Sequence, residues 1–214
     1  MPAFRYTVSD VMTQTAVAIG RKASFKEIVE LIHQWKVSAL PVLEGEGRVV
    51  GVVSEADLLP KEEFRQEDPR LPEQLAEASK AGGVLAEELM SSPAVTVHPD
   101  ATIAEAARIM ARKGVKRLPV VNGIGLLEGV VSRRDLLKVF LRPDEEIEDE
   151  VRNGVLAELA PPIRIDCTVN DGVVTLRGDL RDRALAPLIA RAVRAVEGVV
   201  DVGVDLHHPV GTGA

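Results

Sequence analysis

Hydrophobic positions along the chain follow two periods, every second residue as in a half-buried strand and every third or fourth as in an amphipathic helix. Alternating pairs at 17–19 and 95–97 each precede a helical run. Each run opens on a hydroxyl residue with Glu three positions later, Ser24-Phe25-Lys26-Glu27 and Thr102-Ile103-Ala104-Glu105, the pattern of a capping box. Two apolar strands separated by a glycine-containing turn follow, and then a second helix. The pattern therefore predicts β-α-β-β-α twice.

The two segments are copies of one unit. A shift of 78 residues lays 8–59 over 86–137 without a gap, and 18 of the 52 positions are identical. The identities cluster in Leu-Pro-Val, Gly-Val-Val-Ser and Asp-Leu-Leu, which end at Leu59 in one copy and Leu137 in the other. Only two copies are present, which indicates a tandem domain pair and not a solenoid.

The C-terminal region has a different pattern. Ile147, Val151, Val155 and Leu159 have helical spacing and precede Pro161-Pro162. Alternating strands then flank Asn170-Asp171-Gly172, a strong hairpin-turn signal. A helix starting near Asp182 and burying Leu185, Leu188, Ile189, Ala192, Val193 and Val196 comes next, and a last alternating strand follows at 200–206. The order is α-β-β-α-β, so we expect a mixed α/β protein in which two repeats form a pseudo-symmetric pair beside a smaller domain.

Charge marks the boundary of that smaller domain. The 214 residues carry 26 Lys and Arg against 33 Asp and Glu, a net charge of −7. Residues 1–143 hold 19 of each, so the excess lies in 144–208, with 7 basic and 14 acidic residues. Six of the acids stand in 144–150, directly after Pro143. The predicted organisation is a first repeat at 8–61, a linker at 62–85, a second repeat at 86–140 and the third domain at 144–208.

Composition excludes several classes of function. Six aromatic residues and an acidic balance argue against a nucleic-acid partner. No apolar run approaches the 18 residues of a membrane span, and the first residues lack a signal-peptide core. The single Cys fits a reducing compartment, and we expect a cytoplasmic protein.

The repeated unit, with its Leu-Pro-Val strand and Gly-Val-Val-Ser-x-x-Asp-Leu ending, closely resembles a CBS domain, and the two copies together look like a Bateman module. The third region is similar to a BON domain in its hairpin from Val169 to Gly178 and its ending from Glu197 to Val202. The CBS resemblance implies a regulatory ligand that contains adenosine, such as AMP, ADP or ATP, and no required cofactor. BON domains are often linked to phospholipid surfaces.

The resemblance also implies which residues contact the ligand. The Asp of Ser-x-x-Asp would accept hydrogen bonds from ribose hydroxyls, the Ser and the helix N-terminus would face phosphate, and backbone before Leu-Pro would contact adenine. In this chain the candidates are Ser38, Ala39, Ser54, Asp57, Thr96, Lys116, Arg117, Ser132, Arg133, Arg134 and Asp135. An ionised carboxylate matches a cis-diol because it only accepts hydrogen bonds.

Each candidate has a simpler interpretation. Ser54-x-x-Asp57 and Ser132-x-x-Asp135 are also legitimate capping boxes. The basic residues Lys116, Arg117, Arg133 and Arg134 could merely coat the surface, but as a group they predict that the pocket of the second repeat prefers a phosphorylated ligand. Glu55, in the first repeat, would repel phosphate unless it points away.

Catalysis finds little support in the sequence. The four His residues have no metal-ligand spacing, Cys167 lies on the apolar face of a strand, and no phosphate-binding glycine loop occurs. We therefore expect no enzyme and no metal.

The leading hypothesis is a sensor with an unknown protein target, and the alternative is a ligand-free scaffold whose third domain binds a protein or a membrane. Wide apolar helix faces at 25–35, 103–110 and 136–140 predict a homodimer through the pair. The 14 acids argue against membrane binding, leaving Arg177, Arg181 and Arg183 as the only candidate lipid-facing patch.

Overall fold

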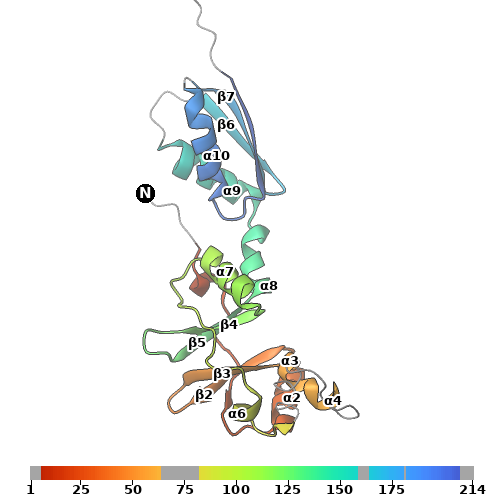
Figure 1. Ribbon diagram of the computed structural model, residues 1–214. Helices are drawn as coiled ribbons and strands as arrows, with labels where there is room; N and C mark the ends of the chain where they lie inside the picture. Colours follow the sequence, from red (N-terminus) through yellow and green to blue (C-terminus); the bar gives the residue numbers. More distant parts are fainter. Residues whose placement is uncertain (1–5, 64–81, 159–163, 181, 208–214) are drawn as a thin grey trace, which may run out of the picture. The chain divides into compact units, whose positions relative to one another are not determined.

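The computed structural model describes residues 6–63, 82–158, 164–180 and 182–207 (Figure 1). The described residues form two compact units. Residues Thr7–Asp135 contain both repeats, and Tyr6 together with the residues from Leu136 onward forms the second unit. The sequence also indicates a short helix at 72–80 within the predicted linker, and this segment lies outside the described residues.

The first repeat contains a small mixed sheet and one long helix. Strand β1 runs parallel to β2, and β2 pairs antiparallel with β3, so that Ala39 lies opposite Ser54. The elements are α1 (Val8–Val11), β1 (Ile19–Gly20), α2 (Phe25–Trp35), β2 (Ala39–Glu44), β3 (Arg48–Ser54), α3 (Glu55–Leu58) and α4 (Pro60–Glu63). Helix α2 starts at the predicted box, where the hydroxyl of Ser24 accepts a hydrogen bond from Glu27 N at 3.3 Å.

The second repeat reproduces this arrangement 78 residues later. Its elements are α6 (Ala86–Leu89), α7 (Ile103–Lys113), β4 (Arg117–Val121), β5 (Leu127–Ser132) and α8 (Arg133–Leu136). Gly114 ends α7 in a left-handed conformation with φ +67°, as the sequence predicts. The alternating residues at 95–97 form no strand, and Val97 contributes a single parallel bridge to Val120.

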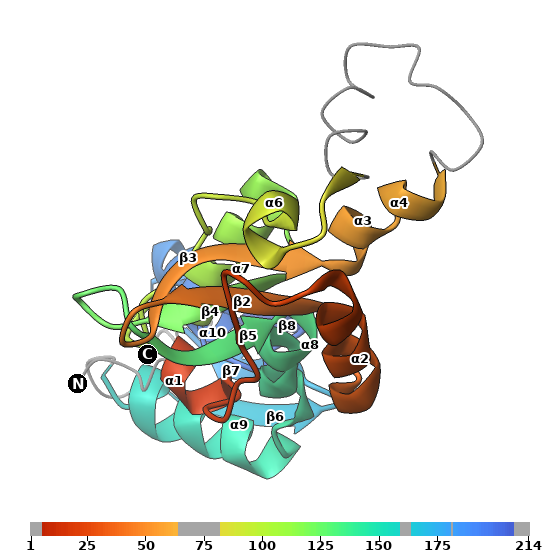
Figure 2. The same cartoon turned by 90° about the horizontal axis from the view of Figure 1, so that it is seen from below.

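The two repeats exchange their first segments. Helix α6, which begins the second repeat, lies beside β3 of the first (Figure 2), and Ala86 N donates to Ala23 O at 2.9 Å. Leu89 of α6 is fully buried in the hydrophobic core of the first repeat. The reciprocal contact is made by α1, where Val8 N donates to Ala101 O at 2.8 Å. Each core is therefore completed by residues that belong, in sequence, to the other copy.

The same exchange explains the glycine of each Gly-Val-Val-Ser motif. A Cβ atom at Gly129 would stand 2.7 Å from the backbone oxygen of Thr13, which belongs to the start of the first repeat. At Gly51 it would collide with the side chain of Met90 from the start of the second. Only glycine leaves room for the exchanged segments to pair with β3 and β5.

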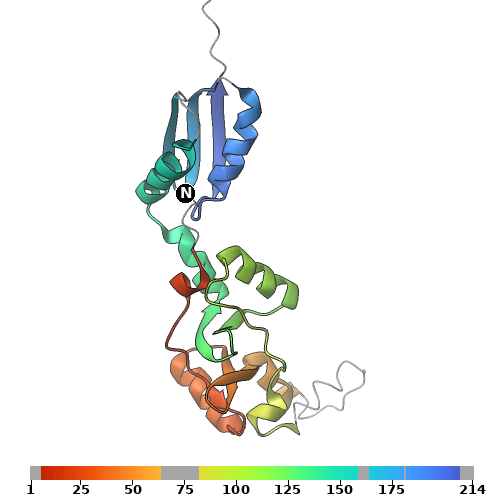
Figure 3. The same ribbon diagram turned by 90° about the vertical axis from the view of Figure 1, so that its left-hand side faces the viewer.

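The second unit is a three-stranded sheet with helices packed against it. Strand β7 lies between β6 and β8, antiparallel to β6 and parallel to β8 (Figure 3). Its elements are a 3₁₀ helix (Leu137–Leu141), α9 (Asp144–Glu150), a π-helical turn (Val151–Leu156), β6 (Arg164–Asn170), β7 (Val173–Asp179), a 3₁₀ turn (Arg183–Leu185), α10 (Ala186–Arg194) and β8 (Asp201–His207). Ile147, Leu176 and Val193 belong to its core.

Two sequence expectations for this unit need correction. Leu188 and Ala192 are expected in the core but are exposed, Leu188 to 61%, because α10 begins at Ala186 and turns Ile189 and Val193 toward the sheet. The helix expected from Ile147 onward is not uniform, since α9 ends at Glu150 and a π-helical turn continues it.

The hairpin turn and the acidic segment of this unit are connected. Asn170 pairs with Val173 across the predicted turn, in which Asp171 and Gly172 both have positive φ. The carboxylate of Asp144 accepts hydrogen bonds from Asp171 N at 2.7 Å and Gly172 N at 2.8 Å. The acidic run therefore begins a helix, as expected, and its first carboxylate also holds the hairpin.

Arg142, which lies just before α9, connects α9 to the turn before β8. Its guanidinium forms an ion pair with Glu150 at 2.8 Å and donates to Glu197 O at 2.6 Å. Tyr6 N donates to the Glu197 carboxylate at 3.0 Å, and the Tyr6 ring lies 5.3 Å from the guanidinium carbon. Residues from both ends of the chain thus meet at one charged cluster.

Candidate functional site

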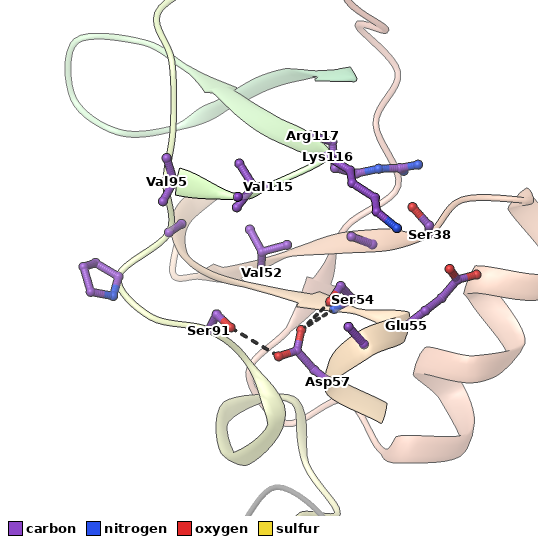
Figure 4. A pocket seen from close by; sticks show the side chains of 15 residues that line it. Ser38, Val52, Ser54, Glu55, Asp57, Ser91, Val95, Val115, Lys116 and Arg117 are labelled. Atoms are coloured by element: carbon purple, nitrogen blue, oxygen red, sulfur yellow. Dashed lines mark hydrogen bonds between the residues drawn. The ribbon is translucent and has the colours of Figure 1, made fainter. Parts of the chain in front are cut away.

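A cavity of about 230 Å³ lies within the unit formed by the two repeats, and both repeats line it (Figure 4). The first repeat contributes the ends of β2 and β3 and the start of α3. The second repeat contributes the segment that follows α6, from Ser91 to Val95, and the turn between α7 and β4. The lining residues are Ser38, Ala39, Val52, Ser54, Glu55, Ala56, Asp57, Ser91, Pro93, Ala94, Val95, Gly114, Val115, Lys116 and Arg117.

Asp57 is the carboxylate at one end of this cavity. Its Oδ2 accepts hydrogen bonds from Ser54 N at 2.8 Å and Ser54 Oγ at 2.6 Å, so the capping interpretation of the motif is correct. Its Oδ1 accepts from Ser91 Oγ at 3.2 Å, and Ser91 belongs to the other repeat. A carboxylate accepts about four hydrogen bonds. Capping and ligand binding are therefore compatible at this residue.

The second Ser-x-x-Asp has the same local geometry. Asp135 Oδ2 accepts from Ser132 N at 2.9 Å and from Ser132 Oγ at 2.6 Å. Neither residue lines the cavity described above. The two copies are thus alike in their caps and differ in what surrounds them.

The basic residues that flank the second motif separate into two groups. Lys116 and Arg117 line the cavity of Asp57, and in Figure 4 Lys116 extends toward the end where Ser38 and Ser54 lie. Arg133 and Arg134 do not line it, and Arg133 donates instead to Val115 O at 3.1 Å. The positive charge that the sequence assigns to the second repeat is therefore shared with the Asp57 end of the first.

Thr96 also lies apart from the cavity. It lines a separate hollow on the second repeat, together with His98, Arg108 and Arg112. Of the eleven candidate residues, the structure brings six to one cavity: Ser38, Ala39, Ser54, Asp57, Lys116 and Arg117.

Arg117 has an unusual environment for a guanidinium. Burial lowers its pKa, while the nearby carboxylates of Asp135 and Glu55 act in the opposite direction. Its Nε is buried and finds no hydrogen-bond acceptor among the residues that the structure describes. An unsatisfied buried donor on a charged group is costly, which makes this atom a candidate contact for an anion.

Apolar side chains form the rest of the wall. Val52, Val95 and Val115 face the space between the two repeats (Figure 4), and Ala39 and Pro93 also line the cavity. An apolar slot with two carboxylates, Glu55 and Asp57, and two cations at its edges suits a flat, uncharged ring that carries polar and charged substituents.

Several cavity residues escape the sequence argument. Ser91, Pro93 and Val95 stand at the start of the second repeat, and nothing local marks them as neighbours of Asp57. The repeat itself holds the only signal. Their equivalents 78 positions earlier are Thr13, Thr15 and Val17, and Thr13 pairs with Val130 just as Ser91 pairs with Val52.

Other chemistry has no support in the described part of the chain. No group of three or more His, Cys, Asp or Glu side chains within it could hold a metal ion. Cys167 is fully buried, and burial raises the pKa of its thiol to about 11, which keeps it protonated near neutral pH. No helix among the described residues is long and apolar enough to cross a bilayer.

Comparison with known proteins agrees with this architecture. The CBS domain matches residues 8–61 and 86–142, and the BON domain matches residues 143–207. The chain belongs to the CBS-domain family. The expected tandem CBS pair followed by a BON domain is therefore confirmed, as is the mixed α/β class.

Two curated relatives match about two thirds of the chain. The chloroplastic CBS domain-containing protein CBSX2 of Arabidopsis thaliana is 29% identical in a comparison over 160 residues, and the match covers 67% of this chain and 67% of that one. An uncharacterized protein of Methanocaldococcus jannaschii, MJ1426, is 29% identical in a comparison over 153 residues, and the match covers 63% of this chain and 90% of that one. An inosine-5'-monophosphate dehydrogenase of Korarchaeum cryptofilum is 28% identical, and the match covers only 28% of its length.

Solved structures show the same fold. A crystal structure of CBSX2 in complex with AMP has a TM-score of 0.57 and 30% identity, and the match covers 64% of this chain and 97% of that one. The CBS pair of protein MJ0100, solved with 5'-methylthioadenosine and S-adenosyl-L-methionine, has a TM-score of 0.52 at 20% identity, which supports the fold alone.

Proposed function

We propose that this protein is a non-catalytic sensor whose CBS pair binds an adenosine-containing ligand, of the AMP, ADP or ATP type, in the cavity at Asp57. The single observation that carries the proposal is the composition of that cavity. Both repeats line it, the Asp57 carboxylate lies beside the Glu55 carboxylate among its polar residues, and valine side chains form much of its wall. The AMP complex of CBSX2, a protein with 30% identity, supports the same class of ligand.

Each part of an adenine nucleotide has a matching group in the cavity. The Asp57 carboxylate would accept hydrogen bonds from the ribose cis-diol, which offers two donors. The valine side chains would pack on the faces of the adenine ring, and the backbone around Ser38 and Lys116 would contact its polar edge.

The ligand-bound state would be relayed to the BON domain through the chain itself. Helix α8 ends at Leu136, the 3₁₀ helix begins at the next residue, and α9 begins at Asp144. Only Arg142 and Pro143 separate the last two elements. A connection this short transmits a change in α8 better than a long flexible linker would.

Calorimetric titration of the full-length protein with AMP tests the proposal, with thermal melting as a second readout. A ligand that binds only the folded state stabilises it by about 2.7 kcal/mol at a concentration one hundred times its Kd. If AMP, ADP, ATP, NAD and S-adenosylmethionine at millimolar concentration neither release heat nor shift melting, the sensor proposal is wrong and the scaffold alternative takes its place.

We also propose a homodimer through the CBS pair. Trp35, at the end of α2, is 55% exposed and forms an apolar surface together with the half-buried Leu31. Phe140 and Leu141 are exposed as well. Light scattering at micromolar concentration tests this, and the mass of one 23.0 kDa chain would contradict it.

We propose a protein, and not a membrane, as the target of the BON domain. Arg177 stands 3.9 Å from Asp205, so that part of its charge is already balanced, while Arg181 and the side chain of Arg183 lie outside the described residues. We expect no co-sedimentation with anionic liposomes at physiological salt. Robust co-sedimentation that is lost when Arg177, Arg181 and Arg183 are changed to Ala would contradict this.

A further inference from the structure

Strand β8 forms one edge of the sheet in the second unit, and its core-facing side is only partly covered. It pairs with β7 on one side, and among the described residues no strand pairs with it on the other (Figure 3). Val204 is the register partner of the fully buried Leu176 and therefore faces the core side of the sheet. Val204 is nevertheless 43% exposed. An apolar side chain on the core side of an open edge is a surface that a further strand can cover.

The backbone of β8 alternates in the direction of its hydrogen-bonding groups. The carbonyl of His207 accepts a hydrogen bond from Leu180 N at 2.8 Å, and Leu180 directly follows β7. Odd-numbered residues of β8 therefore direct their N–H and C=O groups toward β7, and even-numbered residues direct theirs to the open edge. Val204 lies at the middle of that edge.

Side chains of the same chain already occupy one end of the edge. Val202 N donates to the carboxylate of Asp201 at 2.7 Å, and Val202 O accepts from the guanidinium of Arg194 at 3.5 Å. Both contacts agree with the outward direction of the even-numbered residues. Across the rest of the edge, the described part of the chain supplies no hydrogen bond to Val204 or Leu206.

The core-facing row of β8 is complementary to itself in an antiparallel arrangement. If Val204 lies opposite Val204 of a second copy, Val202 lies opposite Leu206. The row that faces the core side is then apolar from end to end. Each of these three residues also directs its N–H and C=O groups toward the other strand, so the same register satisfies the backbone of the open edge.

Charges on the opposite face of the strand select this register. With the twofold axis at Val204, Asp201 faces His207 of the second copy and Asp205 faces Gly203. An axis one residue earlier would place Asp201 opposite Asp205, and an axis one residue later would place Asp205 opposite itself. Like charges directly opposite each other destabilise a sheet, and only the axis at Val204 avoids them among these three.

We propose that two copies of this chain pair through β8, antiparallel about a twofold axis at Val204, so that their two BON sheets become one continuous sheet. The interface is isologous, with the same strand contributed by each copy. Val202 O can accept the additional hydrogen bond because a carbonyl has two lone pairs, and Asp201 leaves Val202 N to face His207. The inference depends neither on the adenosine ligand nor on a homodimer through the CBS pair.

Disulfide trapping in the full-length protein tests the register. Cys167 is the single cysteine of the chain and is fully buried, so introduced thiols react alone. In the proposed register Gly203→Cys of one copy lies opposite Asp205→Cys of the other, with Cα atoms about 4.5 Å apart, a separation that a disulfide spans. A Cβ atom at Gly203 meets its nearest neighbour, Val174 O, at 3.9 Å, so the substitution has room.

We expect a mixture of the Gly203→Cys and Asp205→Cys proteins to form a mixed disulfide under mild oxidation, and each protein alone to form none. Identical positions of the two copies are offset by two residues, about 8 Å between Cα atoms, which is too far for a disulfide. The matched control is a mixture of Val173→Cys with Asp205→Cys. Val173 is exposed on the same face of the sheet but belongs to the central strand β7, so this mixture should form no disulfide.

A second variant tests the apolar row. Val204→Lys, introduced into both cysteine proteins, places two cations opposite each other and should abolish the mixed disulfide. Because Val204 is partly exposed, the unpaired chain can direct the ammonium group to water, and melting temperatures measured without oxidation show whether the variant is folded. Val173→Lys in both proteins adds the same charge on the central strand and should leave the mixed disulfide unchanged.

The outcomes distinguish this interface from the one proposed for the CBS pair. Absence of the mixed disulfide would overturn the pairing through β8, even if light scattering returned the mass of a dimer. Trapping by Asp205→Cys alone would overturn the register, and a mixed disulfide that survives Val204→Lys would show collision of exposed thiols and not a paired strand. A mixed disulfide that is lost in Val204→Lys and kept in Val173→Lys supports the proposal.

Discussion

The two CBS repeats have nearly the same local structure and different surroundings. Their long helices, α2 and α7, each have eleven residues and the same type of N-terminal box. Their Ser-x-x-Asp ends agree to within 0.1 Å in both cap hydrogen bonds. Yet Asp57 lies in a cavity with two cations of the other repeat, while its equivalent Asp135 does not line that cavity. The two copies have kept the same local geometry, and a few substitutions in the flanking residues are enough to make the surroundings of Asp57 and Asp135 chemically different.

The comparison also shows where the boundary of a repeat lies in space. In sequence, α6 begins the second repeat, but in the structure Ala86 and Leu89 complete the core of the first. In return, Val8 and Val11 of α1 are buried where α1 meets the start of α7. Neither repeat has a complete core without the other, so the pair and not the single copy is the folding unit.

The largest expected effect tests this exchange. Leu89→Ala removes a fully buried side chain and should destabilise the protein by about 2–5 kcal/mol, measured by urea denaturation. Native-state hydrogen exchange should show the loss of protection in β2 and β3 of the first repeat, because that is the core Leu89 completes. Loss confined to β4 and β5 would mean that the repeats are independent.

The second prediction compares the two aspartates directly. Asp57→Ala and Asp135→Ala each remove equivalent cap bonds, so each variant controls for the stability loss of the other. Removal of a charged acceptor costs about 1.5–3 kcal/mol, and we expect AMP affinity to fall roughly ten- to hundredfold for Asp57→Ala and much less for Asp135→Ala. Flanking charges in the sequence favour the opposite ranking. Titration calorimetry that returned that ranking would place the main ligand contact at the second repeat.

A smaller difference is expected between the two motif glycines. Gly129→Ala places its Cβ against the backbone oxygen of Thr13, which is fixed by a hydrogen bond from Val130 N at 3.0 Å. Gly51→Ala places its Cβ against the flexible side chain of Met90. Thermal denaturation should give about 1–3 kcal/mol for Gly129→Ala and a smaller loss for Gly51→Ala. Equal losses would contradict the difference in rigidity between the two contacts.

The smallest expected effect concerns the helix caps, where the copies should behave alike. Ser24→Ala and Thr102→Ala should each cost about 1 kcal/mol in chemical denaturation. Hydrogen bonds from Thr102 lower the pKa of Glu105, so its contribution is present above the ordinary value of 4.5 and is lost as the pH falls through the lowered value. The effect of Thr102→Ala should therefore shrink in acid. A large difference between the two caps near neutral pH would show that one helix depends on contacts beyond its cap.

Some of the site was accessible from sequence, and some was not. Ser54 and Asp57 were recognised because the motif occurs twice, and both their cap and their place at a cavity were expected alternatives that turned out to be compatible. Lys116 and Arg117 were recognised as basic flanks but assigned to the second repeat, since sequence proximity puts them beside Ser132. Ser91 and Val95 carry no signal of their own, because a hydroxyl and a valine acquire their role only from the segment they face.

The secondary-structure elements, the duplication and the family can all be predicted from the amino-acid sequence. These depend on hydrogen bonds and apolar spacing within about four residues, such as the caps at Ser24 and Ser54 or the turn at Asp171. Three other features follow from tertiary contacts: Lys116 and Arg117 line the cavity at Asp57, Leu188 is exposed, and Asp144 binds the hairpin turn. Those features arise where segments tens of residues apart meet, and the burial of apolar surface across the two repeats, which no local pattern encodes, sets how they meet.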